Sequence, residues 1–243
     1  MTLLVTTVSL SMVGSLGGLA IASALLLVRE SLRAQYVPGL ISYAVGTLLG
    51  VSLLALLPEA LVTLNPSAGL GTLLAGILSF FMLEKLVIWR HCHTDECQVH
   101  DSSAALILMG GALHNFADGA IIGAAVLSSV PLGMSTAVAV AAHQVPQEVG
   151  DFAILLGAGY SKTRALTANS LTAVAGIVGA VTVYVTAGWL PVGPPYVLAF
   201  AAGSFLYVAM ADLIPGLHRG TVDVGAVRQV LLIAAGIVTV LIL

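Results

Sequence analysis

The sequence from His114 to Asp151 reads HNFADGAIIGAAVLSSVPLGMSTAVAVAAHQVPQEVGD. Metal-ligating side chains cluster at its two ends, and the sequence between them is almost entirely apolar. A charged group inside hydrocarbon costs roughly 2.5–3.5 kcal/mol on insertion scales, so such residues normally face a polar pathway rather than lipid. The stretch therefore predicts two membrane helices with a candidate transport site between them.

The first cluster consists of His114, Asn115 and Asp118. Residues three or four apart lie on one face of a helix. This spacing places His114 over Asp118 and puts Asn115 beside Asp118, so one helix presents nitrogen and oxygen ligands together.

The second cluster repeats this arrangement, with His143 over Gln147 and Gln144 over Glu148. Pro146 removes a backbone N–H, so it should kink the helix and free a carbonyl one turn earlier that could join the site. Imidazole with carboxylate suits Zn²⁺, Fe²⁺ or a similar divalent ion, whereas Mg²⁺ and Ca²⁺ favour oxygen ligands alone. We therefore expect a transition metal.

Composition places the chain in a membrane. Of its 243 residues, 59% are hydrophobic and 8% are charged, with a mean hydropathy of +1.08. A soluble domain has about 25% charged residues. The net charge of −3 is too small to indicate nucleic acid or another charged macromolecule as a partner.

Apolar runs of about 20 residues can each span a bilayer as a helix. We expect an all-α integral membrane protein of about eight such helices, in one transmembrane transporter domain of residues 1–243 with a polar loop at 90–102. The first run has no basic residue ahead of it and exceeds a signal-peptide core in length, so we expect it to be a true helix. The expected spans are Leu3–Val28, Leu40–Leu64, Leu70–Trp89, Ala104–Val130, Leu132–Tyr160, Leu166–Leu190, Tyr196–Ile214 and Val227–Leu243.

Basic residues predict the orientation of these helices. They fall on one side of the expected topology, and the opposite connections contain no Lys or Arg. Because cytoplasmic loops carry the excess of Lys and Arg, both termini should lie outside the cytoplasm, most simply in a cell (plasma or inner) membrane. The basic residues are Arg29, Arg33, Lys85, Arg90, Lys162, Arg164, Arg219 and Arg228.

Two spans end alike. The second closes on Leu57-Pro58-Glu59 and the seventh on Ile214-Pro215, although they run in opposite directions. Such a pattern is typical of an inverted repeat, with the two ligand helices between its halves. Glu59, near the outer end, suits an entrance or a membrane interface. Asp212, nearer the cytoplasmic end, suits a membrane interface and an exit for the ion equally well.

The loop after the third span is rich in metal ligands. Two interpretations stay open: a loose, exchangeable site for soft or borderline metals, or a merely solvated loop. A disulfide is not expected in the cytoplasm, which keeps thiols reduced. The residues of this candidate loop site are His91, Cys92, His93, Cys97 and His100.

The two clusters resemble the signatures of the ZIP (Zrt/Irt-like) family of divalent metal transporters, which read close to His-Asn-x-x-Asp-Gly and His-Glu-x-Pro-His-Glu-x-Gly-Asp. Supporting matches are Leu56-Leu57-Pro58-Glu59, Glu84-Lys85 and Asp212-Leu213-Ile214-Pro215. The resemblance implies eight helices, outside termini, elevator-like or rocking alternating access, and movement of zinc or iron toward the cytoplasm.

The resemblance also implies a ligand set. The first site would be His114, Asp118, His143 and Gln147, and the second would be Asn115, Asp118 and Gln144, with Glu148 close by. Gln144 stands where the family commonly has Glu, and Gln147 where it commonly has His. A neutral amide does not offset the charge of a metal, so both sites should bind more weakly than the usual pattern.

Two other functions are consistent with the clusters. Their polar residues could simply join helices, at about 1 kcal/mol for each hydrogen bond. Alternatively, His114, Asp118 and His143 could hold the zinc of an intramembrane hydrolase and leave one position open for water. The chain lacks a His-Glu-x-x-His motif, so we expect a transporter and not an enzyme. Its expected substrates are divalent metal ions, zinc first and iron or manganese next, and its expected surroundings are lipid. We expect no prosthetic group and no nucleic acid partner. A homodimer is compatible with these expectations.

Overall fold

The structure is a computed structural model that describes residues 2–91, 99–217 and 224–243. Within these ranges it is all-α, without a strand. The described elements form eight continuous rods, because two π-helical segments each join an α-helix to the next one without a break. This architecture confirms the expected fold class. The elements are α1 (Thr2–Leu27), α2 (Glu30–Gly50), η1 (Val51–Leu56), α3 (Leu57–Thr63), α4 (Pro66–His91), α5 (Val99–Ser128), α6 (Val130–Gly157), α7 (Lys162–Thr186), α8 (Gly193–Tyr207), η2 (Val208–Leu213), α9 (Ile214–Leu217) and α10 (Val224–Ile242).

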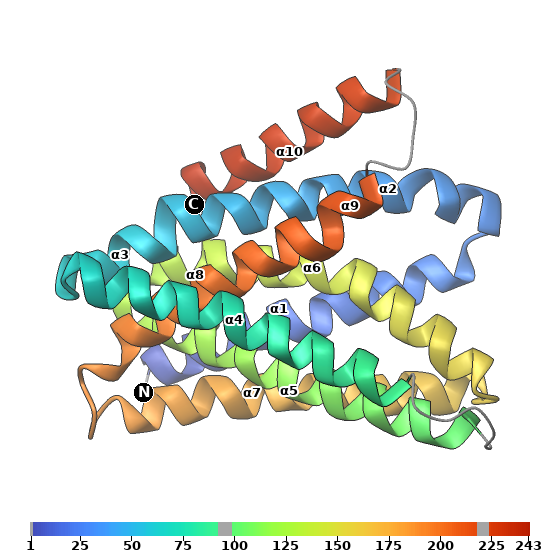
Figure 1. The fold of residues 1–243 in the computed structure, drawn as a ribbon, viewed down its shortest axis with the longest axis horizontal. Helices are drawn as coiled ribbons and strands as arrows, with labels where there is room; N and C mark the ends of the chain where they lie inside the picture. The colour runs from blue at the N-terminus through green and yellow to red at the C-terminus, as the bar shows by residue number, and fades with distance from the viewer. Residues whose placement is uncertain (1, 92–98, 218–223) are drawn as a thin grey trace.

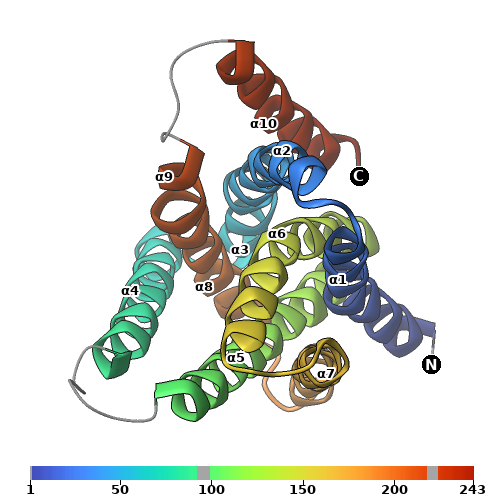
Figure 2. The same cartoon turned by 90° about the vertical axis from the view of Figure 1, so that its right-hand side faces the viewer.

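Six rods of the described chain are long and apolar enough to cross a membrane. The other two are α5 and α6, whose apolar sequence is interrupted by the His, Asn, Gln and acidic clusters. These two helices lie at the centre of the molecule, where the rods around them can shield the polar side chains from lipid (Figure 2).

The rods form two groups. We call α1, α5, α6 and α7 the ligand bundle, since it carries both clusters, and the other helices the flanking bundle. Within the ligand bundle α1 packs on α6 and α5 on α7, and within the flanking bundle α2 packs on α10 and α4 on α8. The bundles touch mainly through α2 with α6 and through α5 with α8. Figure 2 shows the two groups end-on.

Glycines allow the closest helix pairs. A Cβ added at Gly119 of α5 would lie 1.7 Å from the Gly176 carbonyl oxygen of α7. A Cβ at Gly46 would lie 2.1 Å from the Ile233 carbonyl, and one at Gly76 would lie 2.1 Å from the Phe200 carbonyl. Small residues thus let helix backbones touch. This is expected in lipid, where packing and interhelical hydrogen bonds, rather than the hydrophobic effect, drive helix association.

The second and seventh rods share a local distortion. Each has a six-residue π-helical segment directly before its Leu-Pro or Ile-Pro pair. The Leu57 N–H bonds to the Ser52 carbonyl and the Ile214 N–H to the Ala209 carbonyl, five residues back in both cases. Proline lacks an N–H, so a local change of helical pattern near it is expected. The distortions, and the matching pairs α2 with α10 and α8 with α4, fit the predicted inverted repeat.

Both chain ends lie toward the same end of the bundle in Figure 1. The α1–α2 and α6–α7 turns lie at the opposite end, together with the start of α5. Arg29, Lys162 and Arg164 occur in those turns or directly after them. We call this the basic end of the molecule.

Candidate metal centre

Three side chains from α5 and α6 converge at the centre of the ligand bundle. His114 Nε2 lies 3.4 Å from Asp118 Oδ2, as expected for residues four apart on one helix. His143 Nε2 of α6 lies 3.3 Å from the same oxygen and 3.2 Å from His114 Nε2. Asp118 and His143 are almost fully buried, while His114 is partly open. The three atoms form a nearly equilateral triangle.

The size of this triangle suits a small divalent ion. Zinc binds imidazole nitrogen and carboxylate oxygen at about 2.0–2.2 Å in tetrahedral geometry, which separates neighbouring ligand atoms by about 3.3–3.6 Å. The three measured separations of 3.2–3.4 Å lie at the lower edge of this range. His143 Nδ1 lies 3.0 Å from the Ala139 carbonyl oxygen, so Nδ1–H donates there and leaves the Nε2 lone pair for a metal.

A second polar group adjoins the triangle. Asn115 and Gln144 are buried, with Gln144 Nε2 lying 2.5 Å from Asn115 Oδ1 and 3.4 Å from Asp118 Oδ2. Asp118 Oδ1 is buried and has no hydrogen-bond partner in the described part of the chain. Since a buried carboxylate oxygen is normally paired, this free oxygen leaves Asp118 able to bind a second cation.

The amide of Gln144 can be assigned in two orientations, because its oxygen and nitrogen are distinguished by their partners. With the amide rotated by half a turn, its nitrogen donates to the Gly14 carbonyl at 3.0 Å and the Ser15 carbonyl at 2.9 Å. The oxygen then faces Asn115 and the metal triangle. Helix α1 thus offers the amide N–H groups two acceptors and leaves Gln144 in a ligand-like orientation.

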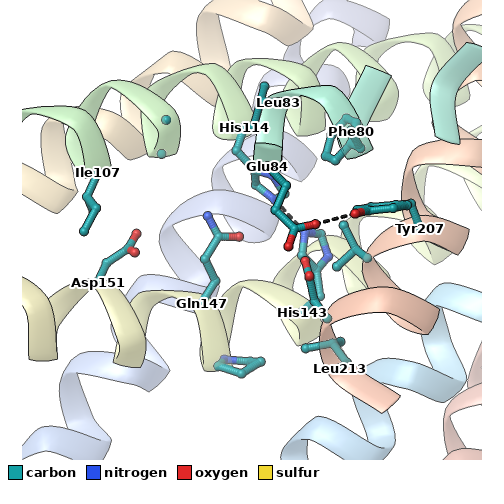
Figure 3. A pocket seen from close by; sticks show the side chains of 15 residues that line it. Phe80, Leu83, Glu84, Ile107, His114, His143, Gln147, Asp151, Tyr207 and Leu213 are labelled. Atoms are coloured by element: carbon teal, nitrogen blue, oxygen red, sulfur yellow. Dashed lines mark hydrogen bonds between the residues drawn. The ribbon is translucent and has the colours of Figure 1, made fainter. Parts of the chain in front are cut away.

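A cavity of about 370 Å³ begins at the triangle and lies between the two bundles. His114 and His143 form its inner wall, and Glu84, Asp151 and Asp212 line it further toward the basic end. Figure 3 shows Gln147 between His143 and Asp151 along this wall. The cavity therefore extends from the candidate site toward the basic end and carries several acidic groups.

The remaining predicted ligands lie apart from the triangle. Gln147 lines the cavity without a hydrogen bond to either histidine among the described contacts. Glu148 is buried outside the cavity lining and lies beside Asn169 of α7. Glu148 Oε2 and Asn169 Nδ2 lack hydrogen-bond partners in the described ranges. The structure thus brings His114, Asp118 and His143 together, places Asn115 and Gln144 beside them, and leaves Gln147 and Glu148 at the margin.

Aromatic residues of the flanking bundle cover the histidines, a feature without a recognisable sequence signal. Phe80 of α4 lies edge-on to His114 with ring centroids 5.8 Å apart, and Phe205 of α8 lies 5.4 Å from the His143 ring. In the same cavity the Tyr207 hydroxyl donates a hydrogen bond to Glu84 (Figure 3). Glu84 was expected only as part of the Glu84-Lys85 match to the family, and no local pattern predicts its contact with Tyr207.

The predicted loop site falls outside the described residues. The bounds of α4 and α5 include His91 and His100, but the structure does not describe those side chains or residues 92–98. A metal site at His91, Cys92, His93, Cys97 and His100 stays a prediction.

Comparison with known proteins gives a consistent picture. Residues 90–243 match the sequence model of a family described as "ZIP Zinc transporter". The chain is 35% identical over 229 residues to "Zinc transporter ZIP13" of Pongo abelii, an alignment that covers 87% of this chain and 68% of that protein. It is 48% identical over 115 residues to "Zinc transporter ZIP4" of Mus musculus, which covers 46% of this chain and only 17% of that protein.

Proposed function

Because the chain belongs to the ZIP zinc transporter family, we propose that it carries a divalent transition metal across the membrane. Zinc is the first candidate, and the ion would bind at the site of His114, Asp118 and His143. One observation carries this proposal: three ligand atoms from two helices lie 3.2–3.4 Å apart, close to the spacing around a zinc ion. Iron and manganese are second candidates, since imidazole and carboxylate bind them as well.

We propose a second, weaker position for the ion beside the first. Asn115 and Gln144 would supply neutral oxygens and Asp118 would bridge both positions through its unpaired Oδ1. Gln147 and Glu148 would join only when side chains or helices shift. Weak ligands suit transport, because conduction requires that an ion can leave as well as enter.

The ion would leave through the cavity toward the basic end. Glu84, Asp151 and Asp212 line that route and favour a cation electrostatically. Because cytoplasmic segments carry the excess of Lys and Arg, the basic end would face the cytoplasm of a plasma or inner membrane, with both termini outside. The structure would then correspond to a state open toward the cytoplasm.

Alternating access would come from movement of the ligand bundle against the flanking bundle. The metal cavity lies between the two bundles, and so does a second cavity of about 350 Å³ at the other end. Glu59 and Pro58 of the flanking bundle and Ser135 of the ligand bundle line this outer cavity. A sliding or rocking step that closes one cavity while opening the other would expose the site to each side in turn.

An intramembrane zinc hydrolase would need the same three ligands with an open position for water. The site meets that minimum, because His114, Asp118 and His143 lie together and the two histidines line a cavity. The relatives are named transporters, however, and transport is the function we propose.

One proteoliposome experiment distinguishes metal transport from zinc-dependent hydrolysis. The purified protein is sealed into liposomes that contain a zinc-sensitive dye, and zinc is added outside with and without a pH gradient. We expect saturable zinc entry and no amide or ester turnover above that of empty liposomes. Zinc-dependent turnover without zinc entry would overturn the transport proposal.

A further inference from the structure

A cavity unrelated to the metal site lies on the outside of the bundle near the basic end. Its volume is about 410 Å³, and it lies between α1, α2 and α10. Ile21 and Leu25 of α1, Leu40 of α2 and Leu232 of α10 form apolar walls. The site can therefore hold a hydrocarbon chain from the surrounding lipid.

A cationic side chain is among the residues that line this cavity. Arg228 of α10 lines it and also lines an adjoining cavity of about 90 Å³ that includes Gln35 and Gln229. Arg228 is exposed, and no described carboxylate forms an ion pair with it. A charged guanidinium is thus available to an anion at the edge of an apolar cavity.

Gly39 of α2 makes room for that guanidinium. A Cβ at Gly39 would lie 3.2 Å from Arg228 Nη2 and 3.2 Å from Leu232 Cδ1. Without a side chain at this position, the guanidinium packs directly against the α2 backbone. The exposed arginine of α10 therefore rests its guanidinium against α2.

Arg228 and Tyr36 lie near the starts of their helices, where the lipid headgroup region is expected. Arg228 comes four residues after the start of α10 and Tyr36 six residues after the start of α2. At 1.5 Å per residue, these offsets amount to about 6 Å and about 9 Å. Tyrosine is enriched at membrane interfaces, and basic pockets between membrane helices bind anionic headgroups. A free phosphate would use the cation but leave the apolar walls uncovered.

We propose that this cavity binds one anionic phospholipid, with its phosphate on Arg228 and an acyl chain against Ile21, Leu25, Leu40 and Leu232. Helix α1 belongs to the ligand bundle, whereas α2 and α10 belong to the flanking bundle. A lipid in the cavity therefore contacts both bundles at once. Any effect of that lipid on metal flux rests on the proposed function, but its binding does not.

Native mass spectrometry of the full chain in detergent tests the binding, using phosphatidylglycerol and phosphatidylcholine with identical acyl chains. We expect one tightly retained lipid, with phosphatidylglycerol preferred about fivefold, the ratio that about 1 kcal/mol for one arginine near anionic lipid corresponds to. Arg228→Gln and Gly39→Leu should abolish the preference, and Arg228→Lys should keep part of it. The matched control is Arg164→Gln at the same end of the molecule, where the guanidinium lies 4.0 Å from the Tyr160 ring centroid.

Three results would overturn the proposal. The first is equal retention of the two lipids by the wild-type protein. The second is an equal loss of preference in Arg228→Gln and Arg164→Gln, which would indicate general surface charge. The third is displacement of the lipid by glycerol phosphate at the same concentration, which would indicate a site for free anions. If Arg228→Gln does not fold, Gly39→Leu and Arg228→Lys provide the same comparison.

Discussion

Asp118 is the residue on which the proposed metal centre would depend. Its Oδ2 lies within 3.4 Å of both histidine nitrogens, and its Oδ1 is buried without a partner among the described residues. An unpaired buried charge is costly, so the arrangement is most stable when a cation or a proton is present. A metal in the first position would bind Oδ2 and the two Nε2 lone pairs together, and Oδ1 would remain for the second position.

We expect the two glutamines, Gln144 and Gln147, to set the strength of metal binding at the proposed site. Gln144→Glu adds a charge beside Asp118, and Gln147→His adds a nitrogen ligand at the cavity wall. The double variant should therefore bind zinc more tightly and release it more slowly. We expect a lower half-saturating zinc concentration, a lower maximal rate, and a shift toward Zn²⁺ over Mn²⁺. Initial uptake rates against metal concentration in proteoliposomes measure all three.

The control for this variant is Asn65→Asp, which adds a carboxylate at an exposed turn outside both cavities. It should leave all three quantities unchanged. If the double variant also leaves them unchanged, neither glutamine contacts the metal, and the site consists of the triangle alone.

Helical spacing predicts part of this site and misses the rest. The four-residue spacing of His114 and Asp118 is sufficient to bring them together on one helix, and their 3.4 Å separation agrees. The orientation of Gln144 depends on carbonyls of α1 that are more than a hundred positions away in sequence. Contacts of Phe80 and Phe205 with the histidines also come from tertiary packing. Such contacts leave no local pattern in a sequence.

Helix α1 approaches Gln144 of the proposed metal site closely at a glycine. A Cβ at Gly18 would lie 2.7 Å from Gln144 Cβ and 3.1 Å from the Ala141 carbonyl, whereas a Cβ at Gly17 would meet nothing within 4 Å. Only one of these neighbouring glycines therefore determines how closely α1 approaches α6.

Gly18→Ala and Gly17→Ala form a matched pair that tests this contact. Overpacking costs typically about 1–3 kcal/mol, so Gly18→Ala should lower the unfolding temperature in detergent and weaken zinc binding by displacing Gln144. Gly17→Ala should keep or raise stability, because alanine favours helix over glycine by about 1 kcal/mol. Thermal unfolding and zinc titration of both variants check the prediction. Equal effects would show that α1 does not position Gln144.

The π-helical segments could be predicted only in part from the sequence. The Pro58 and Pro215 motifs predict a disturbance, since each proline removes an N–H. They do not predict a wider turn upstream of the proline, because that choice depends on neighbouring helices. In η2 the wider turn places Val208, Asp212 and Leu213 on the cavity wall. π-Bulges are frequent at functional sites, and this one forms part of the proposed exit.

The division of the molecule into two bundles was not predictable from hydropathy. Apolar runs indicate about eight spans but carry no information on which helices pair. The pairing follows from glycine contacts such as Gly46 with Ile233 and Gly119 with Gly176, which join residues distant in sequence. The cavities between the bundles follow from this pairing.

If the bundles move against each other, the inner and outer cavities should change in opposite directions. In a background of Cys92→Ser and Cys97→Ser, Leu83→Cys probes the inner cavity and Ser135→Cys the outer one. Conditions that lower labelling of Leu83→Cys by a water-soluble thiol reagent, such as saturating zinc, should raise labelling of Ser135→Cys. The control Leu74→Cys, exposed on α4 outside both cavities, should not change. Parallel changes at both cavities would contradict alternating access.

The basic residues predict how the molecule lies in the membrane. An epitope tag added at either terminus should bind its antibody on intact cells. A tag at the α6–α7 turn, next to Lys162 and Arg164, should bind only after permeabilisation. The reverse pattern would show that the cavity at the basic end opens outward, and the direction of transport would then need revision.

The uptake rate of Asp118→Asn decides whether the transported ion binds the triangle of His114, Asp118 and His143. The amide keeps the shape of the carboxyl group but removes the charge that both histidines face. Even outer-shell partners of a metal cost 10–100-fold when lost, so zinc uptake into proteoliposomes should fall by about 100-fold or more at equal protein content and unchanged folding. Uptake near the wild-type rate in a folded, inserted Asp118→Asn protein would show that the ion crosses elsewhere.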